Sequence, residues 1–65
     1  MSNKSEYMKE AAETHLAHGD VESYDAIMMA IDEPAIANKK YPKQKEAIKN
    51  ALDYANRETW NGRFI

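Results

Sequence analysis

The sequence predicts an all-α fold: a small three-helix bundle in which an N-terminal helical hairpin packs on a longer C-terminal helix. Three observations predict it. Apolar residues recur at the spacing of a helix face in three separate stretches of the chain. Glycine, aspartate and proline residues of the kind that end or cap helices separate these stretches. The length of 65 residues leaves room for a single domain.

The longest uninterrupted helical pattern covers residues 42–60, and the other helices are expected to pack on it. Pro42 suits the first position of a helix, because its ring fixes φ at a helical value and its missing N–H would be unpaired there. Gly62 is expected just past the helix end, in the left-handed conformation that glycine adopts readily. The apolar stripe of this helix consists of Ala47, Ile48, Ala51, Leu52 and Ala55.

Two shorter helices are predicted over about residues 4–18 and 21–32. Gly19 is expected to end the first helix, and Asp20 is well placed to cap the second. Because the connection between them is so short, the two helices should be antiparallel neighbours.

The remaining segments are a short turn over residues 34–38, which Pro34 opens, and an apolar tail over residues 63–65. The tail is expected to fold back on the bundle or to reach another subunit. The predicted core draws on every helix and on the turn: Met8, Ala12, Leu16, Tyr24, Ile27, Met28, Ile31, Ile36, Ile48, Leu52 and Ala55.

The second helix has more apolar surface than one neighbour can cover, because residues 26–31 are apolar without a break. A helix that is apolar on most sides is either central or lies at an interface. Nothing obvious remains in so short a chain to cover a second face. We therefore expect a homodimer or a protein partner to complete the core. The alternative is that Met29 packs under the connection of residues 33–41.

Composition limits the classes of protein to which the chain can belong. At 65 residues, roughly 60% of the unfolded surface can be buried, so a lone core is marginal. The absence of cysteine excludes disulfides and thiolate zinc sites, and it fits a reducing compartment. No stretch approaches the ~20 apolar residues of a transmembrane helix, and the N-terminus carries no signal-peptide core. We therefore expect a cytoplasmic protein that needs no cofactor.

The net charge of −2 hides an uneven distribution. Residues 1–34 carry eight acidic and two basic residues, a net charge of −6, whereas residues 35–65 carry three acidic and seven basic residues, a net charge of +4. Two such halves attract each other within one fold or between two copies. We favour compensation within the fold.

The basic residues of the second half suggest an alternative function, nucleic-acid binding. A cluster of lysines at the start of a helix binds phosphate groups favourably. The cluster consists of Lys39, Lys40, Lys43, Lys45 and Lys49. Against this function, Glu46, Asp53 and Glu58 interrupt the basic face, and the chain as a whole is acidic.

Two histidines one helical turn apart, His15 and His18, could share a metal ion, with a third ligand from Asp20 or Glu22. However, His15 falls within the apolar stripe of the first helix, and a cationic imidazole at His18 is favoured by the helix dipole. Three short helices also enclose almost no concave pocket in which acid–base chemistry could proceed. We therefore predict neither a metal site nor an enzyme.

The function that remains is a small non-enzymatic protein–protein interaction protein, an adaptor, inhibitor or regulator of a larger partner. Aromatic residues dominate the energetics of interfaces, and methionine adapts to irregular partner surfaces. In size and composition the chain resembles small accessory proteins of phages and mobile elements. The residues expected to contact a partner are Met29, Tyr54, Trp60 and Phe64.

Overall fold

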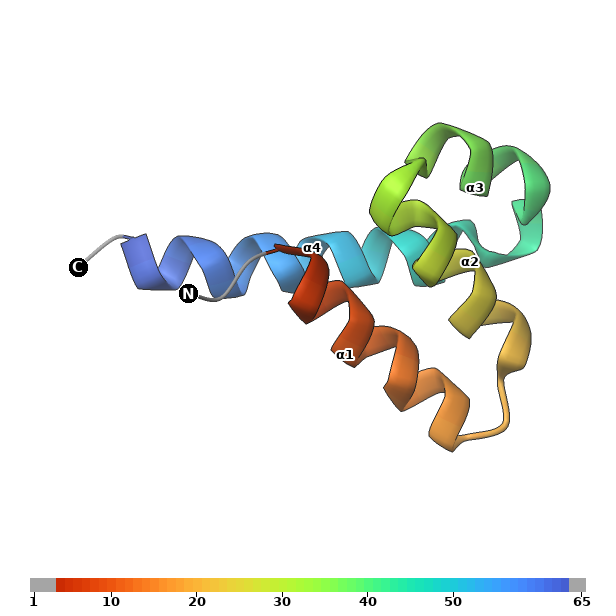
Figure 1. Ribbon diagram of the computed structural model, residues 1–65, viewed down its shortest axis with the longest axis horizontal. Coiled ribbons are helices and arrows are strands. Elements are labelled where there is room, and N and C mark those ends of the chain that lie inside the picture. The colour runs from red at the N-terminus through yellow and green to blue at the C-terminus, as the bar shows by residue number, and fades with distance from the viewer. Residues whose placement is uncertain (1–3, 64–65) are drawn as a thin grey trace.

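The computed structural model describes the backbone of residues 4–63 and the side chains of residues 4–59 (Figure 1). The described residues form helices and turns without a strand, so the predicted all-α class is confirmed. The helices are α1 (Lys4–Ala17), α2 (Val21–Asp32), α3 (Pro34–Lys40), the 3₁₀ helix η1 (Pro42–Gln44) and α4 (Lys45–Arg63).

Helix α2 is the central element, because it contacts α1, α3, η1 and α4. Helix α1 packs on both α2 and α4. Helix α4 is the long helix that runs horizontally in Figure 1 and contacts both of them. The carboxyl end of α1 diverges from α4, and the carboxyl end of α4 extends beyond the other helices. The amino-terminal half of α4 is therefore the part that the bundle covers.

The α1–α2 turn has the geometry that its sequence predicts. Gly19 adopts a φ of +80°, and its amide donates to the carbonyl of Leu16 at 2.9 Å. The amide of Asp20 donates to the carbonyl of His15 at 2.9 Å, which completes a Schellman motif. The Asp20 carboxylate then accepts from the amide of Ser23 at 3.2 Å and from its hydroxyl at 2.8 Å, so that it caps α2.

The predicted turn over residues 34–38 is instead a helix, α3, of seven residues. Pro34 lies in its first turn, as predicted, but the helical backbone continues to Lys40. The helix persists because Ala37 is fully buried, which fixes its inner face. Pro42 opens the single 3₁₀ turn η1, and the α-helical part of the long helix begins only at Lys45.

The predicted end of the long helix is wrong, because α4 continues through Gly62 to Arg63. Glycine lowers helix stability by about 1 kcal/mol relative to alanine, but one such residue does not break a helix. The predicted contacts of Phe64 and Ile65 in the tail lie outside the described residues.

The core is richer in alanine than predicted. Met8, Ala12, Ile27, Ile48 and Ala55 are buried as expected. The other buried apolar residues are Ala26, Ala30, Ala37 and Ala51. These short side chains let the helix backbones approach closely, so the larger residues beside them are pushed to the edge of the core. The predicted core residues that are only half-buried are Tyr24, Met28, Ile31 and Leu52.

Two predicted core residues are exposed. Leu16 is 42% exposed, because it lies near the end of α1 that diverges from α4. Ile36 is 47% exposed, because its neighbour Ala37 occupies the inner face of α3. The buried core therefore consists of several alanines around three larger side chains, Met8, Ile27 and Ile48.

The broad apolar surface of α2 is partly covered within the chain, because Ala26, Ile27 and Ala30 are buried whereas Met28, Met29 and Ile31 are half-buried. Helix α3 packs on α2. Met29 is half-buried and packs against the core, which agrees with the alternative of packing within the chain. The expectation that nothing remains to cover this face was wrong, because the segment after Pro34 is a helix.

Candidate functional site

Five lysines gather where α3, η1 and α4 meet, and we call this surface the basic corner. Its members are Lys39, Lys40, Lys43, Lys45 and Lys49, all of them exposed. The ammonium group of Lys40 lies 5.9 Å from the centroid of the Tyr41 ring, within the range of a cation–π contact. The structure therefore brings the predicted nucleic-acid-binding residues together at one corner of the molecule.

No carboxylate neutralises the basic corner. Among residues 4–59, no lysine or arginine lies within 4.0 Å of an aspartate or glutamate oxygen. Oppositely charged residues spaced four apart on the helices, Lys9 with Glu13 and Asp53 with Lys49 or Arg57, therefore form no ion pair in this part of the chain. Among the described residues, no direct ion pair joins a lysine or arginine of the basic half to a carboxylate of the acidic half.

An exposed isoleucine lies within the basic corner. Ile36 precedes Lys39 and Lys40 by three and four residues in α3, a spacing that places all three on one side of a helix. Helix α3 buries only Ala37 completely. Its outward side thus combines an apolar side chain with ammonium groups, which the sequence analysis missed because it assigned Ile36 to the core.

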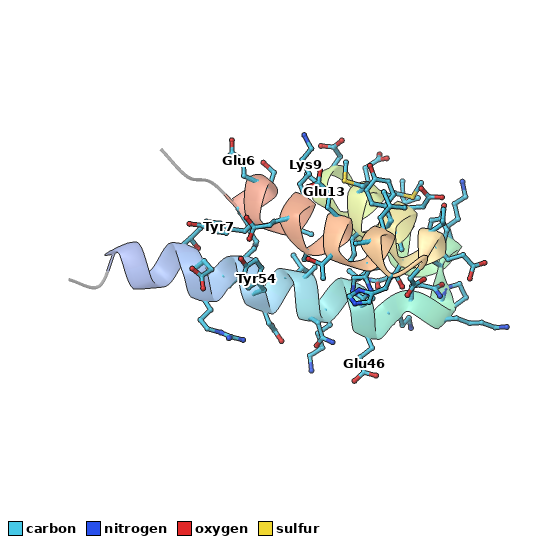
Figure 2. The ribbon with its side chains drawn as sticks, turned by 90° about the horizontal axis from the view of Figure 1, so that it is seen from below. Glu6, Tyr7, Lys9, Glu13, Glu46 and Tyr54 are labelled. Atoms are coloured by element: carbon cyan, nitrogen blue, oxygen red, sulfur yellow. The ribbon has the colours of Figure 1, made fainter. Side chains whose placement is uncertain are left out.

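Tyr54, a predicted partner-binding residue, joins α4 to α1 (Figure 2). Its ring meets that of Tyr7 edge to face, with the centroids 5.8 Å apart and the planes at 83°. Its hydroxyl donates to Oε1 of Glu10. This hydrogen bond, together with partial burial and the charge of Glu10, raises the pKa of Tyr54 to about 12. The side chain therefore already has partners within the chain.

A shallow groove, which we call the α1–α4 groove, lies beside Tyr54. It is lined by Glu10, Ala11, Thr14, His15 and Tyr54. The Thr14 hydroxyl is turned back to the carbonyl of Glu10 at 3.1 Å. Glu58 lies near enough to Tyr54 for its charge to raise the pKa of that hydroxyl as well. Glu10 is thus the carboxylate in the lining of the groove, and no lysine or arginine lines it.

The four predicted partner-binding residues do not form one site among the described residues. Met29 packs against the core, whereas the neighbours of Tyr54 are Tyr7 and Glu10. The side chain of Trp60 and the whole of Phe64 lie outside the described part of the chain. Sequence reasoning could not find the link between Glu10 and Tyr54, because the two residues are 44 positions apart and only the packing of α1 on α4 joins them.

The two histidines have separate contacts at the α1–α2 turn. Nδ1 of His15 lies 3.6 Å from Oδ2 of Asp20. Nδ1 of His18 lies 2.9 Å from the carbonyl oxygen of Thr14, one turn back in α1. Asp20 thus joins the end of α1 to the start of α2. Hydrogen bonds from the Ser23 hydroxyl and amide, and the nearby His15, lower the pKa of Asp20.

Comparison of the chain with protein-family models, curated proteins and solved structures finds no match. None of the helices in the described range is both long enough and apolar enough to cross a bilayer. The surfaces that remain as candidate sites are the basic corner and the α1–α4 groove.

Proposed function

We propose that the chain is a small non-enzymatic interaction protein, an adaptor, inhibitor or regulator that binds a larger protein partner in the cytoplasm. An accessory protein of a phage or mobile element would fit this role. One observation carries the proposal: the lysines of the basic corner lack a carboxylate partner among the described residues, and Ile36, one helical turn before Lys39 and Lys40, is exposed. Such a surface has no evident use within the fold.

The mixed chemistry of the corner favours a protein over a nucleic acid. An isoleucine gains free energy when apolar atoms of a partner cover it, at about 25 cal/mol per Å² of buried apolar surface. Phosphate groups offer Ile36 no such contact. Lysines around an apolar centre fit the usual anatomy of a protein interface, in which a polar rim surrounds a drier core.

The proposal is tested with the tagged chain as bait and two variants of it. The corner variant carries Ile36→Lys and Lys43→Glu; the control carries Lys4→Glu and Lys9→Glu, on exposed positions of α1. A partner that the wild type and the control both retain should be lost by the corner variant. Calorimetry with the purified partner must then reproduce the same order. A partner retained equally by all variants would contradict the assignment of the corner.

Nucleic-acid binding is the second candidate, and the gathering of the lysines is the observation that favours it. Gel retardation with duplex and single-stranded DNA, at low salt, tests it directly. Binding through the corner should fall steeply with salt and disappear when Lys39, Lys40 and Lys43 become Gln. An absence of retardation at low salt would remove this candidate.

A further inference from the structure

The outward side of α3 and the α1–α4 groove carry opposite charges beside apolar atoms. We propose that a second copy of this chain is an occupant of the groove, with the outward side of α3 from one copy docked into the α1–α4 groove of the next. The inference rests on the proposed function, because it takes the corner to be a protein-binding surface, and it adds a second copy of the chain as a further occupant of that surface.

The groove offers an apolar floor beside negative charge. Ala11 and the Tyr54 ring supply apolar surface, and the Glu10 carboxylate lies at the edge. A carboxylate oxygen accepts more than one hydrogen bond, so Glu10 can bind an ammonium group while it still accepts from Tyr54. Glu58, one helical turn beyond Tyr54, adds a second carboxylate.

The outward side of α3 offers the matching groups. Ile36 projects from the helix with 47% of its surface exposed. Lys39 and Lys40 flank it, and neither lies within 4.0 Å of a carboxylate of the described residues. With Ile36 in the groove, the ammonium groups of Lys39 and Lys40 could approach the carboxylates of Glu10 and Glu58. The contact would bury apolar atoms and pair opposite charges on both surfaces.

The geometry also predicts how the assembly behaves. The contact joins two different surfaces, so it is heterologous and either closes into a ring or extends as an open chain. A helix of seven residues buries little area, which makes the contact weak. Because exposed charges supply much of the attraction, salt should weaken it strongly.

The experiment is sedimentation velocity over a wide range of protein concentration, at low and at high salt. The wild type should rise in average mass with concentration at low salt and approach the monomer at high salt. A corner-reversed variant, Lys39→Glu with Lys40→Glu, should stay monomeric. So should a groove-reversed variant, Glu10→Lys with Glu58→Lys.

An equimolar mixture of the two reversed variants should recover association, because the acidic corner of one then faces the basic groove of the other. Two matched controls should behave as the wild type: Lys4→Glu with Lys9→Glu, and Asp25→Lys with Asp53→Lys, all on exposed positions outside both surfaces. Circular dichroism of every variant confirms that the helices remain.

Three results would overturn the inference: a monomeric wild type at the highest concentration, controls that dissociate as the reversed variants do, or folded reversed variants that fail to associate when mixed. None of these affects the proposed function. A groove-reversed chain that still binds a larger partner through its basic corner would leave that proposal standing and remove only the self-docking.

Discussion

The α1–α2 turn and the basic corner connect helices in opposite ways. In the turn, the amides of Gly19 and Asp20 bond to α1, and the Asp20 carboxylate contacts both Ser23 and His15. At the corner, no carboxylate of residues 4–59 lies within 4.0 Å of a lysine, and Ile36 is exposed. We therefore expect the polar side chains of the turn to stabilise the fold, and those of the corner to contribute little to its stability.

The helix that carries the corner is nevertheless essential to the fold, and its inner side gives the largest predicted effect. Ala37→Asp places a carboxylate at a position with 0% exposure, where burial of an unpaired charge costs several kcal/mol (about 3 or more). Urea unfolding followed by circular dichroism should show this loss. Ala35→Asp, on an exposed position of the same helix, should change the free energy of unfolding by less than about 0.5 kcal/mol. Equal effects of the two changes would mean that α3 is not packed as described.

The next effect concerns the backbone of the turn. Gly19→Ala should destabilise the protein by about 1–2 kcal/mol, because a side chain at a φ of +80° is strained although nothing lies within 4 Å of the new Cβ. Gly62→Ala is the matched contrast, because Gly62 lies inside α4 and alanine favours a helix. Thermal unfolding should therefore shift in opposite directions for the two variants. A shared direction would show that the turn does not depend on the left-handed glycine.

The turn could be predicted from sequence because its signals are local. Gly19 and Asp20 specify the end of one helix and the start of the next through their own backbone and side-chain chemistry. The length of α3 could not be predicted in this way, since Ala37 is helical largely because it packs into the core. The same limit explains Leu16 and Ile36, whose exposure depends on where α1 and α4 diverge and on which side of α3 faces inward.

The candidate surfaces follow the same division. The lysines of the corner are close in sequence, so their clustering could be predicted. The α1–α4 groove requires Glu10 and Tyr54 to meet across 44 positions, and no local pattern contains that contact. The spacing of Ile36 from Lys39 and Lys40, three and four residues, could also be read from the sequence. However, an isoleucine is expected in the core, so Ile36 was not predicted to be part of this surface.

A smaller effect is expected from the charge of the turn. The pKa of Asp20 is lower in the folded chain than its ordinary 3.8, so the unfolded chain binds a proton first as the pH falls. The contribution of Asp20 to stability is therefore present at neutral pH and is lost as the pH falls from about 3.8 through the folded pKa. Asp20→Asn should lower the melting temperature at pH 7 and flatten this acid limb. An unchanged acid limb would mean that other carboxylates dominate it.

The smallest effect belongs to the corner, and it completes the comparison. Replacing Lys39, Lys40 and Lys43 by Gln removes charge without adding bulk, and no ion pair within the described chain is lost. The free energy of unfolding should change by about 0.5 kcal/mol or less, because exposed lysines without a carboxylate partner contribute little and the exposed contact of Lys40 with Tyr41 is weak. Urea unfolding of this triple variant beside Asp20→Asn tests the contrast. A loss of stability as large as that of Asp20→Asn would mean that the lysines stabilise the fold. Their lack of carboxylate partners would then no longer support a role in binding a partner.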